Sequence, residues 1–283
     1  MIVITGATGT IGSELVRLLV ERGERVRAIS RRPPRGDPSD SVLWIQVDLA
    51  DRGALPEALA GAEKLFLLTD NGEDMVRLQK NAIRAASQAG VEHVVKLSAL
   101  GATDHSKSVI GLWHFNIERE LKESGIAWTI LRPHHFMQNL LDQRRSIARD
   151  GVLRSPSQEG RIPFIDARDI AAVAAEVLTG SGHEGAIYTL TGSEVRSYRD
   201  AAEVLGSVLG RPIRFVPETD DQAWVRLRAA GDPPWKVAAL LAIAGYQRAG
   251  GPTEATTDTI EQITGRPPRS LEDFVRDHRE AFV

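Results

Sequence analysis

Three glycines near the start of the chain have the spacing and the surroundings of a phosphate-binding turn. They follow an apolar run and precede a segment whose apolar side chains recur at helical spacing; the three are Gly6, Gly9 and Gly12. The first lets the chain turn out of a strand, the second leaves room for a diphosphate, and the third lets the helix pack close to the sheet. The amides of Thr10 and Ile11 would then face an anion at the positive end of the helix. The pattern predicts a dinucleotide site; the alternative is a tight turn that binds no ligand.

The residues after the next two strands indicate which dinucleotide the turn would hold. A Rossmann site for NAD usually has an acidic residue at the end of the second strand, but this chain has Ser30, Arg31 and Arg32 there. A guanidinium binds a 2′-phosphate through paired, charge-assisted hydrogen bonds, so NADP(H) is favoured over NAD(H). Two solvated arginines are the alternative. Asp48, after the third strand, is expected either to meet the adenine or to be a turn residue.

Strands and helices alternate through the first half of the chain. Six strands are expected, at residues 1–5, 25–30, 42–47, 64–68, 93–98 and 127–132. Helices are expected between them, including one at residues 113–124, and this order predicts a Rossmann-type, doubly wound parallel sheet of the α/β class. The second half is less regular, with a helix expected at residues 135–149 and a strand at residues 162–165. We therefore expect a dinucleotide-binding core over residues 1–133. Residues 134–283 form a smaller, mainly helical substrate part interleaved with the core, or both parts form one structural unit.

Composition excludes several classes of function. The chain has 283 residues, a formal net charge of −3 and no cysteine. Disulfides, thiolate nucleophiles and cysteine-ligated metals are excluded, and the net charge predicts no attraction to nucleic acid or an anionic membrane. No apolar run is long enough for a transmembrane helix and no signal peptide is evident, so a cytoplasmic protein is expected.

Six segments together resemble the NmrA-like branch of the atypical short-chain dehydrogenase/reductases. They read ITGATGTIG, SRRPP, VDLAD, KLSALGA, LKESGIAWTILRPHHFMQN and TGRPPRSLEDFVRDH, and they extend over nearly the whole chain. The resemblance implies a Rossmann fold and NADP(H), with quinone reductases, azo-dye reductases and redox-sensing regulators among the members. It places the diphosphate on Gly6, Thr8, Gly9, Thr10, Ile11 and Gly12, and the 2′-phosphate on Arg31. It places Leu68, Thr69 and Ser98 along the cofactor, and Pro133 to Phe136 at the nicotinamide and substrate cleft.

The chain departs from the broader superfamily at its catalytic pair. Those reductases use Tyr-x-x-x-Lys on the helix after the fifth strand, where the lysine lowers the pKa of the tyrosine. The three tyrosines here, Tyr188, Tyr198 and Tyr246, all lie outside that helix, and none is followed by lysine four residues later. The stretch reads GLWHFNIERELK instead, while Ser98 is kept. The usual alcohol and ketone mechanism is therefore not supported.

Hydride transfer to a quinone does not require the strong acid catalysis that the missing Tyr-x-x-x-Lys pair provides. An apolar slot and a weak proton donor are sufficient, and His114, His134 and Ser98 are the candidate donors. The alternative for each histidine is a structural role. The residues expected to line the substrate site are Trp113, His134, Phe136 and Phe164, with core packing as the alternative for the aromatic ones. The adjacent pair His134 and His135 lacks a third ligand at matching spacing, so no metal is expected.

Three functions share this fold. The first is an NADP(H)-dependent oxidoreductase that passes hydride to a quinone or a similar conjugated acceptor, without a Tyr-x-x-x-Lys pair. The second is a non-catalytic sensor that binds NADP(H) and acts through a protein partner. A nucleotide-sugar epimerase or dehydratase comes last because it usually needs the missing tyrosine. The preference for the enzyme depends on family analogy.

Overall fold

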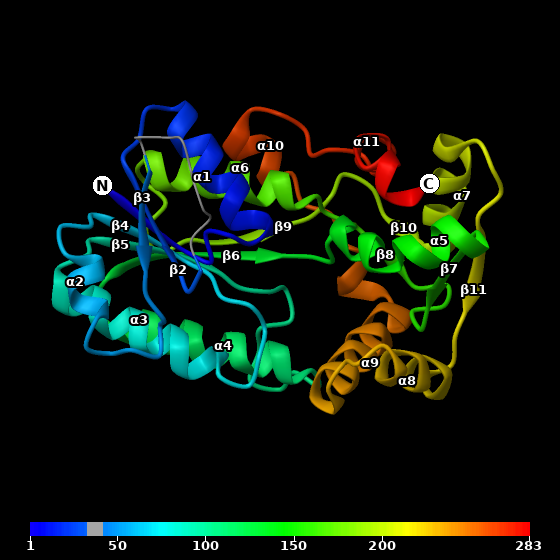
Figure 1. Ribbon diagram of the computed structural model, residues 1–283, viewed down its shortest axis with the longest axis horizontal. Coiled ribbons are helices and arrows are strands. Elements are labelled where there is room, and N and C mark those ends of the chain that lie inside the picture. The colour runs from blue at the N-terminus through cyan, green and yellow to red at the C-terminus, as the bar shows by residue number, and fades with distance from the viewer. Residues whose placement is uncertain (33–41) are drawn as a thin grey trace. The chain divides into compact units, whose positions relative to one another are not determined.

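The computed structural model describes residues 1–32 and 42–283, and these form two compact units (Figure 1). Unit 1 comprises residues 1–104, 110–132 and 168–189, and unit 2 comprises residues 105–109, 133–167 and 190–283. The units do not divide at residue 133 alone, because residues 168–189 of the second half belong to unit 1. They contribute a helix and most of a strand to the first unit, so chain order alone does not separate the two units.

Unit 1 is built on a seven-stranded parallel sheet in the order β3-β2-β1-β4-β5-β6-β9. Its strands are β1 (Ile2–Thr5), β2 (Val26–Ser30), β3 (Val42–Gln46), β4 (Lys64–Leu67), β5 (His93–Leu97), β6 (Ala127–Pro133) and β9 (Ile187–Leu190). The first six pair in parallel. The strand order reverses between β1 and β4, and such a switch point is where an open α/β sheet binds its ligand, at the carboxyl ends of the strands.

Helices cover both faces of this sheet (Figure 1). Helices α1 (Thr10–Glu21) and α6 (Ala167–Thr179) lie on one face, and α3 (Met75–Ala89) and α4 (Val109–Glu123) lie on the other. The short helix α2 (Leu55–Leu59) connects β3 to β4. Right-handed crossovers between parallel strands produce this arrangement, as expected for a doubly wound fold.

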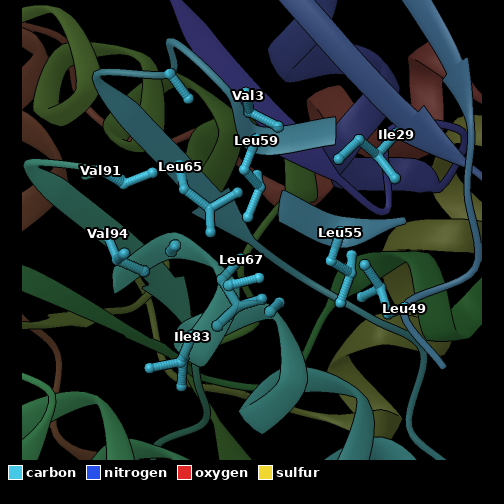
Figure 2. Packing of buried hydrophobic residues seen from close by; sticks show 14 of the residues in the cluster. Val3, Ile29, Leu49, Leu55, Leu59, Leu65, Leu67, Ile83, Val91 and Val94 are labelled. Carbon is cyan, nitrogen blue, oxygen red and sulfur yellow. The ribbon is translucent and has the colours of Figure 1, made fainter. Parts of the chain in front are cut away.

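The core of unit 1 lies between the sheet and the helices that follow β3, β4 and β5. Figure 2 shows side chains of this buried cluster, among them Val3, Leu65, Leu67 and Ile83. The central strands β1, β4 and β5 are buried almost throughout, so their sequences are nearly continuous apolar runs rather than alternating ones. Polar residues buried in or beside the strands, such as Lys96 of β5 and Ser98 just after it, therefore need partners within the fold.

Unit 2 is mainly helical. Its elements are η1 (Met137–Gln143), α5 (Arg144–Asp150), β7 (Val152–Ser155), β8 (Arg161–Ile162), β10 (Arg196–Ser197), α7 (Tyr198–Leu209), β11 (Arg214–Pro217), α8 (Asp220–Ala229), α9 (Pro234–Ala249), η2 (Gly251–Glu254), α10 (Thr259–Thr264), α11 (Leu271–Asp277) and η3 (Arg279–Phe282). Strands β7 and β11 pair in parallel, and β8 and β10 pair antiparallel. A separate apolar core includes Leu153, Phe164, Leu205 and Phe274.

Three local elements differ from the sequence predictions. Helix α4 begins at Val109, four residues earlier than expected, because burial of Ile110 and Gly111 outweighs their poor helix propensity. The helix expected at residues 135–149 is a 3₁₀ helix followed by α5. The strand expected at residues 162–165 stops at Ile162, since Pro163 has no N–H to continue the ladder.

No helix within residues 1–32 and 42–283 combines the length and the apolar character that a membrane span requires.

Candidate functional site

The glycine turn lies at the switch point of the sheet, between β1 and α1. Gly6 has φ +65°, and a Cβ atom there would lie 2.9 Å from the carbonyl oxygen of Leu68. A Cβ atom on Gly12 would lie 2.1 Å from the carbonyl oxygen of Gly6 and 2.9 Å from Cα of Ala7. At each position the atoms that the added Cβ would contact are backbone atoms, which cannot move away by a change of side-chain rotamer. Glycine is therefore required at both positions, for the turn and for the close approach of helix α1 to it.

The first turn of α1 is open to an anion. Gly9 is its N-cap residue, no side chain caps its amides, and the first turn has no acidic residue. Thr8 and Thr10 are exposed, whereas Ile11 is buried within unit 1. A helix N-terminus carries about half a positive charge and unpaired N–H groups, so uncapped amides at the carboxyl end of β1 fit a diphosphate. Contact of these residues with a cofactor stays a prediction.

Hydrogen bonds at the end of β4 fix the loop that follows it beside the glycine turn. The Thr5 hydroxyl donates to the carbonyl of Leu68 at 2.8 Å and accepts from the Leu68 amide at 2.9 Å, which fixes the end of β4 against β1. Gln79 of α3 is fully buried, and its amide donates to the Thr69 hydroxyl at 2.8 Å. The loop after β4 is thereby held at the switch point, where Leu68 and Thr69 are predicted to lie along the cofactor.

Arg31 and Asp48 follow β2 and β3 on the same side of β1. Arg31 and its neighbour Arg32 are exposed, which leaves both guanidinium groups accessible to a phosphate. The two prolines that complete the SRRPP segment lie outside the described residues. The Asp48 carboxylate accepts the Ala50 amide at 2.8 Å, so it stabilises its own turn. Adenine recognition by Asp48 therefore has no support beyond its position.

Ser98, at the carboxyl end of β5, is part of a buried ionic network. Its hydroxyl donates to the Glu118 carboxylate at 2.5 Å, and Arg132 of β6 binds the same carboxylate at 2.9 and 2.6 Å. Glu118 is 1% exposed, so the paired guanidinium offsets the cost of burying its charge. Because Ser98 gives its proton to Glu118, its oxygen faces other groups as an acceptor. This arrangement argues against Ser98 as the proton donor.

Lys96 and His114 form a second buried pair beside this network. The Lys96 Nζ atom donates to the Leu97 carbonyl at 2.8 Å and lies 3.0 Å from His114 Nδ1. Lys96 is fully buried, and burial together with the charge of Arg132 lowers its pKa to about 7, although Glu118 acts in the opposite direction. Burial and the Lys96 charge hold the pKa of His114 well below its usual range. The histidine is therefore neutral, and the lysine titrates near neutral pH.

The other candidate donor, His134, lies in unit 2 just after Pro133. Its Nε2 atom is 3.0 Å from the Thr253 carbonyl, and its Nδ1 atom accepts the His135 amide at 2.7 Å. Burial lowers the pKa of His134 to about 4. Its single ring proton is thus held by a carbonyl, which makes His134 a poorer proton donor than His114.

The aromatic residues expected at the substrate site belong to different units. Phe164 belongs to the core of unit 2, where its ring meets those of His135 and Tyr198 edge-on at 5.7 and 5.4 Å between centroids. Phe136 forms a β-bridge to Ile165 in the same unit. Trp113 belongs to unit 1, where it packs against the sheet core. Their substrate roles stay predictions, and core packing accounts for Phe164.

Sequence reasoning missed three members of the buried networks, namely Lys96, Glu118 and Arg132. Two signals were available. A lysine interrupts the apolar run HVVKL of a central strand, and His114 and Glu118 are four residues apart on the helix where the superfamily has Tyr-x-x-x-Lys. Such residues occupy one face of a helix. Within the part of the chain that the structure describes, no three His, Asp or Glu side chains are arranged to hold a metal ion.

Comparisons with known proteins identify the family and support the fold. The profile of the NmrA-like family matches residues 1–257. The chain is 38% identical to an NAD(P)H azoreductase from Xenophilus azovorans, over 100% of this chain and 99% of that protein. It is 37% identical to a (4-alkanoyl-5-oxo-2,5-dihydrofuran-3-yl)methyl phosphate reductase from Streptomyces griseus, over 100% and 99%. The crystal structure of an NADPH-dependent quinone oxidoreductase from Escherichia coli, complexed with NADPH, superposes with a TM-score of 0.88 at 29% identity, over 98% and 99% of the two chains.

Proposed function

The chain belongs to the NmrA-like family, and we propose that it is an NADPH-dependent reductase that transfers hydride to a quinone or a similar conjugated acceptor. The observation that carries the proposal is the open glycine turn at the switch point of the sheet. Full-length similarity to proteins named as NAD(P)H-dependent or quinone reductases supports the reaction class. NADPH would supply the hydride, two electrons with one hydrogen, to the electron-poor acceptor.

The residues of unit 1 have distinct tasks in this proposal. The amides of Thr10 and Ile11 bind the diphosphate at the positive end of α1, and Arg31 binds the 2′-phosphate. Ser98, with its proton committed to Glu118, offers an acceptor to the carboxamide of the nicotinamide. The Ser98–Glu118–Arg132 network therefore orients the cofactor rather than donating a proton to the acceptor.

The acceptor class follows from what the site lacks. No tyrosine lies on α4, so the phenol that protonates a ketone in the broader superfamily is absent from that helix. A quinone becomes aromatic on reduction, so hydride transfer to it proceeds with weaker acid assistance than a ketone requires. An electron-poor acceptor is therefore a better match to this site than a simple ketone.

The test is NADPH oxidation with a panel of quinones, with NADH in parallel and cofactor binding measured by calorimetry. We expect turnover of at least one quinone, faster with NADPH than with NADH. Tight NADPH binding without turnover of any quinone would overturn the proposal. The non-catalytic sensor of NADP(H) would then be the better explanation, and the search would turn to a protein partner.

A further inference from the structure

The buried pair of Lys96 and His114 has no part in binding the dinucleotide, yet it lies next to the site. Lys96 is two residues before Ser98 on the same face of β5, and the Lys96 Nζ atom reaches the Leu97 carbonyl. His114 of α4 therefore lies against the last residues of β5, at the carboxyl edge of the sheet. Burying a lysine in a central strand costs free energy unless its charge is paired, and a function would account for that cost.

We propose that Lys96 and His114 form a proton relay in which His114 Nε2 is the donor to the reduced acceptor and Lys96 Nζ restores the proton at Nδ1. The inference rests on the reductase activity proposed above and supplies its missing acid. It differs from the superfamily arrangement because the lysine comes from β5 rather than from the helix, and because an imidazole takes the place of the phenol.

The contacts decide the direction of the relay. The Lys96 Nζ atom lies 3.0 Å from His114 Nδ1, and an ammonium can only donate. When Lys96 is protonated, Nδ1 therefore accepts, and the ring proton of the neutral imidazole is on Nε2. Lys96 has no exposed surface, whereas His114 keeps 7% of its own. The lysine can therefore exchange its proton with a bound acceptor only through the histidine ring. Its depressed pKa, about 7, allows that exchange at neutral pH.

Besides the two members of the pair, two charged groups affect their pKa values, one on α4 and one on β6. On α4, the Glu118 carboxylate is already bound by Ser98 and Arg132. On β6, the Arg132 guanidinium repels a proton on either member of the pair. With Glu118 occupied, no ion pair within residues 1–32 and 42–283 directly compensates the Lys96 ammonium. The protonated form of the pair is therefore disfavoured, and the pair readily gives up its proton.

The step balances in protons and electrons. Hydride adds two electrons and one hydrogen to one carbonyl oxygen of the quinone and leaves an oxyanion on the opposite oxygen. That oxygen takes the proton from His114 Nε2, His114 Nδ1 takes one from Lys96, and the products are a neutral hydroquinone and a neutral amine at Lys96. A phenol-type oxyanion has a proton affinity near that of tyrosinate, with a pKa of about 10, so transfer from Lys96 is downhill. Solvent then returns one proton to the pair.

The variant that tests the relay is His114→Gln, because glutamine still accepts a hydrogen bond from Lys96 but cannot pass a proton on. His93→Gln is the matched control. His93 is likewise a buried histidine, but it belongs to β5, and its ring forms a hydrogen bond with the Thr129 hydroxyl at 2.9 Å. The reaction is followed with two para-quinones, one alkylated and one halogenated. Halogens stabilise the oxyanion, so its protonation matters less.

We expect His114→Gln to slow reduction of the alkylated quinone about 100-fold, the usual contribution of a general acid. The loss should be smaller for the halogenated quinone, with NADPH affinity unchanged and with His93→Gln close to the parent. In the parent protein, kcat should fall above about pH 7, because Lys96 loses its proton there. His114→Gln should abolish that pH dependence. Equal losses with both quinones, or a parent-like rate in His114→Gln, would overturn the relay.

A second measurement is independent of activity. Nitrogen NMR of histidine in the cofactor-free protein should show His114 as the neutral tautomer with its proton on Nε2. Lys96→Met should change the Nδ1 signal, since its hydrogen-bond donor is lost. A proton on Nδ1 in the parent would overturn the relay whatever the kinetics. A parent protein that reduces no quinone refutes the proposed function. An active parent protein whose rate of quinone reduction is unchanged by His114→Gln refutes the relay alone.

Discussion

Alanine at Gly12 should damage the stability of the protein, whereas alanine at Gly9 should damage cofactor binding. An added Cβ on Gly12 would lie 2.1 Å from the Gly6 carbonyl oxygen and 2.8 Å from its carbonyl carbon. That oxygen would have to move by more than 1 Å to restore ordinary contact. Overpacking of this kind costs about 3 kcal/mol, and the better helix propensity of alanine returns about 1 kcal/mol, so we expect a net loss of about 2 kcal/mol.

Gly9 provides the contrast within the same turn. Its Cβ would meet only the Gly6 carbonyl oxygen, at 3.3 Å, and its φ of −82° suits any residue. Stability of Gly9→Ala should stay within about 0.5 kcal/mol of the parent, while the methyl group occupies space needed by the diphosphate and weakens NADPH binding. Urea unfolding and calorimetric titration with NADPH measure the two quantities. A fully stable Gly12→Ala, or a Gly9→Ala that binds NADPH normally, would refute the assignment for that glycine.

Three further predictions concern charged residues of unit 1. Arg31→Ala should weaken NADPH binding by about 1.5–3 kcal/mol and leave NADH binding nearly unchanged, with Arg32→Ala as the matched control in the same titrations; equal affinity of the parent for both cofactors would contradict the assignment. Glu118→Gln should destabilise the protein by about 3 kcal/mol in urea, because Arg132 loses its buried counter-ion. An unchanged unfolding midpoint would show that the network contributes no net stability. Lys96 has a pKa of about 7 in the folded protein and 10.5 as its ordinary value, so between these the unfolded chain binds more protons and stability should rise with pH. Lys96→Met should remove that rise, about 1.4 kcal/mol per pH unit above pH 7 at most, in unfolding curves measured along a pH series; an unchanged slope would mean that Lys96 keeps its ordinary pKa.

Local sequence determined the dinucleotide half of the fold. The run from Ile2 to Thr5, the glycines after it and the amphipathic α1 are neighbours in the chain, so spacing alone specifies the strand, the turn and the helix. The position of Arg31 at the end of β2 follows from the same alternation. A doubly wound parallel sheet was also expected, because parallel strands joined by helices have few permitted topologies.

Only the tertiary structure decided which distant residues meet. Nothing local pairs β7 with β11, or assigns residues 168–189 to unit 1, because both depend on contacts between segments far apart in the chain. The buried networks have the same origin. No local pattern assigns a role to Lys96 of β5, since its partner His114 is 18 residues away on another element. Sequence names the groups that can carry charge, but burial and opposed neighbours set their pKa values, and these arise only when the strand and the helix pack together.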